Sequence, residues 1–219
     1  MQHHTATKSA GHPVWLLVAF WFSVAIALSV VIRRLVEFVR PSQSGPPMML
    51  SLNAAFSSHA VLTAAHIIPA AIFVLLAAAI LLGNWGGAWS ERSFFLFGAA
   101  TAATAYAMSR YAVGGWLERS AVLVFDSWFL ISLARAYWFR LHGEPTRKRE
   151  WMARAVGILL GIATTRPVMG LLFATSSRTH LGPGEFFGIA FWLGFSINTA
   201  ATELWLRSNR RAQLRSIAG

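Results

Sequence analysis

Long apolar segments separated by short polar connections dominate the pattern along this chain. A helix needs about 20 apolar residues to cross the hydrocarbon core of a bilayer, and six segments come close to that length. They are Pro13–Ile32, Ala60–Leu82, Phe94–Val113, Ala121–Phe139, Trp151–Thr175 and Phe186–Leu206. The pattern therefore predicts an all-α integral membrane protein, a six transmembrane helix bundle that forms a single membrane domain over residues 1–219.

The longest connection, Arg40–Ser58, contains two kinds of sequence. Its first part carries the turn-forming residues Pro41, Gly45 and Pro46, which predict a loop. The following stretch, Met48–Phe56, is largely apolar but too short to cross a bilayer. We therefore expect a short helix lying in the membrane interface.

The composition supports lipid as the solvent of this chain. Hydrophobic residues make up 56% of the 219 residues, and charged residues only 12%, about half the usual share of roughly 25% in a soluble domain. The chain has no cysteine. This excludes disulfides, thiolate metal sites, iron–sulfur clusters and thiol catalysis within the chain.

The formal net charge of +11 raises the question of nucleic acid as a partner. The basic residues, however, cluster at the ends of apolar segments, which is the distribution expected from the positive-inside rule. They form no basic stripe with interleaved aromatic residues on a soluble domain. The expected partner is the lipid bilayer, with no nucleic acid.

The distribution of Lys and Arg also predicts the topology. One side of the predicted bundle holds ten of them: Lys8, Arg92, Arg140, Arg147, Lys148, Arg149, Arg207, Arg210, Arg211 and Arg215. The other side holds five, namely Arg33, Arg34, Arg40, Arg119 and Arg178. The larger group predicts that both termini are cytoplasmic, with residues 1–12 as an N-terminal tail and 208–219 as a basic C-terminal tail.

Two further patterns concern packing. Seven of the ten tryptophans lie near predicted helix ends, where aromatic rings form belts at the two membrane interfaces: Trp15, Trp85, Trp89, Trp116, Trp138, Trp151 and Trp205. The third segment, Phe94–Val113, is rich in alanine and contains Gly98. Small residues let helix backbones approach closely, so this segment is predicted to lie at the centre of the bundle.

Ionisable residues inside the apolar segments are the candidate polar site. Asp126, Arg166 and Glu203 lie within predicted spans, where a charged group costs roughly 2.5–3.5 kcal/mol at the bilayer centre and therefore usually faces partners in the bundle. Arg154 and Glu203 lie at similar depth on antiparallel neighbours, which predicts an ion pair.

Arg166 lies deeper than these two residues, about 15 residues into the fifth segment. Asp126 is the acid nearest to Arg166 in depth. Arg110 is a rival partner for Asp126. These charges either lock the bundle together or form an intramembrane polar site, with Asn198 on the last helix as a further member.

Histidines are the candidate ligands for a metal or haem b. His59 and His66 lie seven residues apart on one helical face, and His180 is expected on the same side of the membrane. Neutral imidazoles suit zinc or copper. Haem needs histidines on facing helices, and only the second segment offers any within a span. Hydrogen bonding within the fold is the alternative role for these residues.

The run from Lys148 to Arg154 reads Lys-Arg-Glu-Trp-Met-Ala-Arg and is followed by Thr164-Thr165-Arg166. It resembles the late signature of the bacterial membrane protein family called domain of unknown function 2306, which reads His-Arg-x-Trp-Met-x-Arg and then Thr-x-Arg. The last segment, with Asn198, Glu203 and Arg207, also resembles that family. His66 aligns with a family histidine that opens an apolar helix.

The resemblance covers about residues 60–208 and implies a bacterial cytoplasmic (inner) membrane location. Two family histidines are missing here. Lys148 replaces one, and Ser90–Ser93 occupies the region where the family has the other. If these histidines bind something in the family, this chain has lost that site. The family has no known function, so the resemblance implies a fold and candidate residues without an activity.

No Walker loop, GxSxG or HExxH motif is present, so nothing in the sequence indicates an enzyme. Three hypotheses remain. The first is a non-catalytic subunit or scaffold of a larger membrane complex with other membrane subunits as partners. The second is a small transporter or binding protein for a lipid, quinone or anion, using the buried Arg, Asp and Glu residues. The third is a haem- or metal-binding redox protein.

Overall fold

The computed structural model of the chain describes residues 14–41, 44, 47–82, 87–179 and 181–218. In these residues it is all-helical, without a strand. The helices are α1 (Val14–Val39), α2 (Pro47–Ser57), α3 (Ala60–Leu81), α4 (Ala88–Met108), the 3₁₀ turn η1 (Ser109–Tyr111), α5 (Gly115–Leu141), α6 (Pro145–Leu159), α7 (Gly161–Ala174), α8 (Ser176–Thr179) and α9 (Pro183–Ala218).

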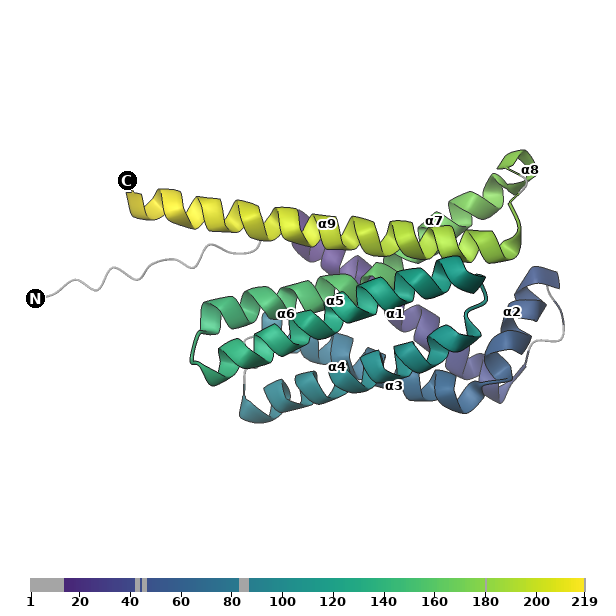
Figure 1. Cartoon of the computed structure of the whole chain (residues 1–219), viewed down its shortest axis with the longest axis horizontal. Coiled ribbons are helices and arrows are strands. Elements are labelled where there is room, and N and C mark those ends of the chain that lie inside the picture. The colour runs from purple at the N-terminus through teal and green to yellow at the C-terminus, as the bar shows by residue number, and fades with distance from the viewer. Residues whose placement is uncertain (1–13, 42–43, 45–46, 83–86, 180, 219) are drawn as a thin grey trace, which may run out of the picture.

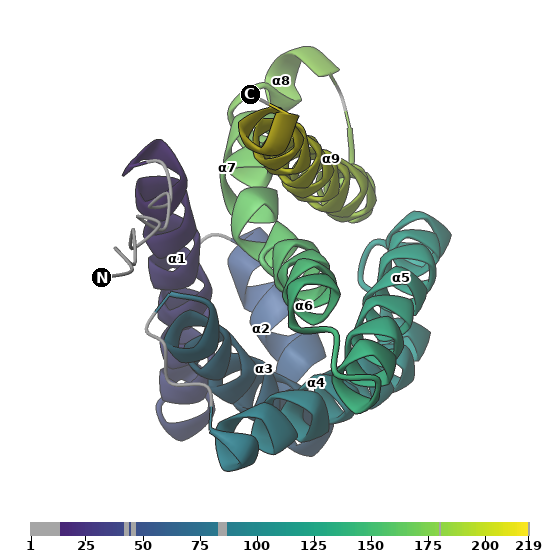
Figure 2. The ribbon, with the colours of Figure 1, turned by 90° about the vertical axis from the view of Figure 1, so that its left-hand side faces the viewer.

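The long helices run roughly along one axis (Figure 1). Viewed end-on, α1, α3, α4 and α5 form a curved row around α6 and α7, and α9 lies beyond α7 (Figure 2). The helix α6 contacts α3, α5 and α9, and α7 contacts α1 and α9. The centre of the bundle is therefore the fifth predicted segment. The prediction that the alanine-rich third segment lies there is wrong, because α4 packs at the edge between α3 and α5.

Four helical stretches in the described residues are long and apolar enough to cross a membrane: Val14–Val39, Ala60–Leu81, Gly115–Leu141 and Pro145–Ala174. The last joins α6 and α7, which are separated only at Leu160. These four correspond to the first, second, fourth and fifth predicted spans. The third and sixth predicted spans are also helices, α4 and α9, but they fall outside this apolar group.

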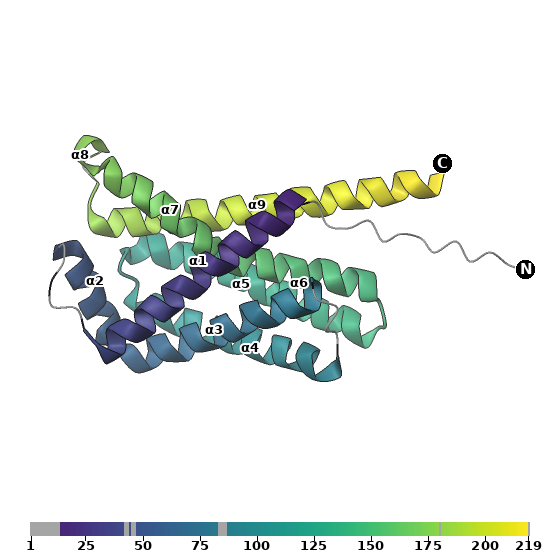
Figure 3. The same cartoon turned by 180° about the vertical axis from the view of Figure 1, so that it is seen from behind.

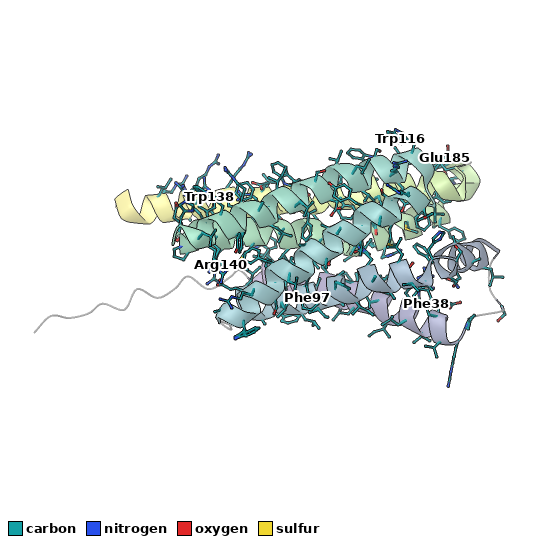
Figure 4. All side chains as sticks on the ribbon, turned by 60° about the horizontal axis from the view of Figure 1, so that its bottom comes forward. Phe38, Phe97, Trp116, Trp138, Arg140 and Glu185 are labelled. Carbon is teal, nitrogen blue, oxygen red and sulfur yellow. The ribbon has the colours of Figure 1, made fainter. Side chains whose placement is uncertain are left out.

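Exposed tryptophans on α5 match the thickness of a bilayer. Trp116 and Trp138 lie at opposite ends of this helix (Figure 4) and are 71% and 47% exposed. The helix between them is ~33 Å long, close to the roughly 30 Å hydrocarbon core. The separation of these two rings along α5 is therefore the separation that belts at two membrane interfaces would have.

Several helix ends differ from the sequence prediction. The helix α1 continues past Ile32 to Val39, and α5 begins at Gly115 rather than Ala121. The predicted C-terminal tail is helical over 208–218, because α9 runs on to Ala218 and extends beyond the bundle. The short helix predicted over Met48–Phe56 is confirmed as α2, whereas the predicted N-terminal tail, residues 1–12, lies outside the described residues.

The ends of the helices fall into two groups. The starts of α1 and α4, the ends of α3 and α9, and the α5–α6 turn lie at one end, and α2 and α8 lie at the other (Figures 1 and 3). At the first end Glu91 of α4 binds Arg140 of α5 at 3.0 Å and forms a short ion pair with Lys148 of α6. Ion pairs therefore join α4 to α5 and α6 at the end of the bundle where the sequence predicts their connections to share one side of the membrane.

Small residues set the packing of α6 and α7 against α9. Gly157 lies against Thr202, and Gly161 lies against Phe195. Gly194 faces the backbone of α7, and a Cβ there would lie 2.7 Å from the amide nitrogen of Thr165. Close approach of this kind is how membrane helices gain van der Waals contact without a hydrophobic driving force.

A candidate binding cavity inside the bundle

A cavity of about 220 Å³ lies in the half of the bundle near α2. Its lining comes from α1, α2, α3, α4, α5, α6, α7 and α9, together with the η1 turn. Most of the wall is apolar, and five phenylalanines contribute to it: Phe56, Phe125, Phe129, Phe191 and Phe195. Six ionisable side chains also line it, namely Arg34, His66, Tyr111, Glu118, Asp126 and Arg166. An apolar pocket with a few convergent polar groups is the usual form of a small-molecule site.

Arg34 reaches the cavity because α1 continues past the apolar run in which a crossing was predicted. Its Nη1 donates a hydrogen bond of 3.1 Å to Oδ1 of Asn53, and its guanidinium lies 4.1 Å from the centre of the Phe56 ring. Both partners belong to α2. Arg34 thus ties α2 to the end of α1 and is already satisfied by protein groups.

Glu118 is buried in the first turn of α5. Its Oε2 accepts a hydrogen bond of 2.6 Å from the backbone nitrogen of Gly114, just before the helix begins. Gly115 has φ +61°, a left-handed conformation that glycine adopts without a Cβ penalty. The Gly-Gly turn therefore folds back onto the carboxylate and holds it at the cavity wall.

Arg166 enters the cavity from α7 without a hydrogen-bonding partner for its buried Nε atom in the described residues. The charge of Glu118 attracts it, and the charges of Arg33 and Arg34 repel it. The predicted partner was Asp126, and this prediction is wrong: no ion pair joins the two in the described part of the chain. Glu118 is the acid whose charge attracts Arg166, without an ion pair between them in the described residues.

Asp126 lies on α5 beside Phe125 and near Phe129. Its Oδ2 is buried and has no hydrogen-bonding partner among the described residues. A buried polar atom without a partner costs about 1–3 kcal/mol relative to a satisfied one. Two unpartnered polar atoms, on Asp126 and on Arg166, therefore line the same cavity.

Of the candidate histidines in the described residues, His66 lines the cavity and His59 does not. Nδ1 of His66 lies 3.2 Å from the carbonyl oxygen of Thr101 and 3.1 Å from Oγ1 of Thr104, both on α4. His59 is separate: its ring lies 3.8 Å from that of Tyr111, and its Nδ1 lies 2.9 Å from the Ser58 hydroxyl. His180 lies outside the described residues.

The described residues contain no group of three His, Cys, Asp or Glu side chains placed to hold a metal. His59 and His66 do not converge, since one packs on η1 and the other on α4. The redox hypothesis with haem b or a metal therefore gains no support from these two residues.

The remaining predicted residues lie away from the cavity lining. Arg154 binds Glu203 through two contacts, Nε to Oε1 at 2.5 Å and Nη2 to Oε2 at 3.2 Å, so the predicted ion pair is confirmed. Oδ1 of Asn198 accepts a hydrogen bond of 2.7 Å from the Thr164 hydroxyl. These contacts join α6 and α7 to α9, and none of the three residues lines the cavity.

The apolar helices and the polar groups between them indicate a helical membrane protein with an interior cavity of about 220 Å³. Comparison with protein-family models, curated proteins and solved structures finds none that matches this chain.

Proposed function

We propose that this protein is a six-helix bacterial inner-membrane protein that binds a small amphipathic molecule in its central cavity. In this proposal α4 and α9 cross the membrane with the four apolar stretches, and both termini are cytoplasmic. The ligand has an apolar body and a head with a hydrogen-bond acceptor, as lipids with acidic heads and quinones do. This is the transporter or binding-protein hypothesis rather than an enzymatic one.

The unpartnered Arg166 carries the proposal. An arginine held in an apolar cavity without a hydrogen-bonding partner at Nε is destabilising, because burial removes water and nothing replaces it. A ligand oxygen beside Nε would supply a charge-assisted hydrogen bond, which is about twice as strong as a neutral one. The position of Glu118 supports the need for a ligand. Its carboxylate is hydrogen-bonded to the Gly114 backbone, and it attracts Arg166 by charge without forming an ion pair with it.

The size and lining of the cavity limit which ligands could bind there. At about 220 Å³ it lies below the roughly 300–1,000 Å³ of drug-sized pockets. It therefore fits a head group or a single ring, with any long tail leaving between helices. Phenylalanine rings on α5 and α9 provide flat apolar walls for such a group.

Arg166→Leu tests this proposal. We expect the variant to retain at most about a tenth of the small molecule that co-purifies with the wild type. Mass spectrometry of extracts from protein in lipid nanodiscs measures the amount bound. The ligand-free variant should also unfold at a higher temperature than ligand-free wild type, because leucine removes a buried charge. Arg119→Leu, at an exposed position on the same cavity-lining helix as Glu118, is the matched control and should change neither result. Undiminished ligand in Arg166→Leu would contradict the proposal.

A second candidate function, a subunit of a larger membrane complex, is favoured by the end of α9. Arg207, Arg211 and Arg215 recur at every fourth position and are exposed. Like charges at this spacing destabilise a helix by about 0.2–0.5 kcal/mol per pair, unless an acidic partner neutralises them. This part of α9 extends past the other helices (Figure 1), so an acidic segment of another chain has access to it.

Charge reversal tests the subunit proposal. In native gels of mildly solubilised membranes, we expect the wild type to migrate in a larger complex and Arg211→Glu with Arg215→Glu to migrate as the chain alone. Arg119→Glu, a reversal at an exposed position on α5, should leave the complex intact. Migration of the wild type as the chain alone would exclude a stable complex.

A further inference from the structure

The hydrogen bonds of His66 fix which ring nitrogen carries the proton. The carbonyl oxygen of Thr101 only accepts hydrogen bonds, so Nδ1 of His66, 3.2 Å away, must donate. The Thr104 hydroxyl gives its proton to the backbone, 2.7 Å from the carbonyl oxygen of Ala100, and so acts toward Nδ1 as an acceptor. Nε2 of the neutral ring is then an acceptor, and it has no hydrogen bond within the described part of the chain.

Nε of Arg166, Oδ2 of Asp126 and Nε2 of His66 are polar atoms of cavity-lining residues that make no hydrogen bond within the described part of the chain. Nε of Arg166 is a donor, Nε2 of His66 is an acceptor, and Oδ2 of Asp126 is an acceptor when the carboxyl group is ionised. Both α3 and α5 begin at the α2 end of the bundle. His66 lies ~9 Å and Asp126 ~16 Å along these helices from that end. The two acceptors are thus at different depths along one apolar cavity.

These three atoms discriminate between the ligand classes allowed by the proposed function. The carboxylate of a fatty acid would satisfy Arg166, but it has no proton to donate to His66 or Asp126. A quinone likewise offers only acceptors. A quinol, a flat ring with hydroxyl groups on opposite edges, offers donors for the two acceptors and oxygen lone pairs for Arg166.

We propose that the ligand of this cavity is a hydroxylated aromatic ring of the quinol class. One hydroxyl donates to Nε2 of His66 and the opposite hydroxyl donates to Asp126, while a ring oxygen accepts from Nε of Arg166. The ring lies against the phenylalanines of α5 and α9, which favour aromatic partners. This inference rests on the proposed function, since it specifies the ligand of the same cavity.

Equilibrium binding to the full chain in lipid nanodiscs tests the inference. The probes are a decyl-substituted 1,4-benzoquinol kept reduced under argon, the corresponding quinone, and laurate. We expect the quinol to bind at least tenfold more tightly than either other probe. His66→Phe and Asp126→Leu should each weaken quinol binding about tenfold and leave laurate binding unchanged, because each removes an acceptor that only the quinol uses.

Controls keep the two proposals separable. His142→Phe alters an exposed histidine that packs on Trp138 at the opposite end of α5 from the cavity, and should leave all three affinities unchanged. Arg166→Leu should weaken all three probes. Two results would overturn the quinol assignment alone. One is that laurate or the quinone binds as tightly as the quinol, and the other is that neither His66→Phe nor Asp126→Leu changes the affinity for the quinol. Failure of every probe to bind the wild type overturns this inference and the proposed function together.

Discussion

Replacing Arg154 by leucine is expected to lower the free energy of unfolding by about 3–5 kcal/mol, because it leaves Glu203 as an uncompensated charge among helices. The two side chains are 12% and 26% exposed and are joined by two contacts. Glu203→Leu should be less destabilising, since Glu150 remains 4.0 Å from Arg154 and the Trp151 ring lies 4.5 Å from its guanidinium. Titration of unfolding with a denaturing detergent in mixed micelles measures both losses.

The double variant Arg154→Leu with Glu203→Leu separates pairing from packing. We expect it to lose less stability than Arg154→Leu alone, since replacing a whole ion pair by apolar groups is often nearly neutral. The matched control is the pair of Glu144 and Arg147, which is 3.2 Å apart but 40% and 64% exposed. Breaking such a pair should change stability by at most about 1 kcal/mol. Strictly additive single losses at Arg154 and Glu203 would show that the pair contributes nothing.

Gly194→Val is expected to lower the free energy of unfolding by about 2–3 kcal/mol and to separate α7 from α9. A Cβ at this position would lie 2.7 Å from both the amide nitrogen and Cγ2 of Thr165, and 3.0 Å from the carbonyl oxygen of Gly161. Backbone atoms of a central helix cannot rotate away as the end of a side chain can. The same detergent titration measures the loss.

Gly170 provides the control for this substitution on the facing helix α7. No atom lies within 4 Å of a Cβ built there. Gly170→Ala should therefore leave stability unchanged or raise it by roughly 0.5–1 kcal/mol, because alanine loses less backbone freedom in a helix. Equal losses at the two glycines would show that helix propensity, not close packing, determines the effect at Gly194.

Depth along the helices predicted some contacts but not others. Arg154 and Glu203 could be paired from the sequence, because a short connection makes their helices antiparallel neighbours at matching depth. The same reasoning failed for Arg166 and Asp126. Counting residues gives height in the membrane but not the direction in which a residue faces around the helix. The charge that attracts Arg166 comes from Glu118 instead.

The missed cavity residues, Arg34 and Glu118, both lie just outside the apolar runs that were used to predict the spans. Hydropathy ends a segment at the first charges, whereas a helix ends where its backbone hydrogen bonds end. The helix α1 continues through Arg33-Arg34 because apolar residues resume at Leu35 and Val36. The Gly114-Gly115 pair marked the start of α5 and could have placed Glu118 in its first turn.

The ion pair between Glu91 and Lys148 was not predicted from the sequence. The two residues lie far apart along the chain but are adjacent in space, because α4 and α6 start at the same end of the bundle.

The ion pairs and the cavity occupy opposite halves of the bundle. Glu91, Glu150 and Glu203 join α4, α5, α6 and α9 toward the α5–α6 turn, whereas the cavity lies toward α2. The first half is thus joined by ion pairs. The cavity half is held by apolar contact and by hydrogen bonds, such as those of Arg34 to Asn53, of His66 to α4 and of Trp192 to Ser120. Under the proposed function, a ligand would therefore enter and leave through the cavity half of the bundle, which has no ion pair between helices among the described residues.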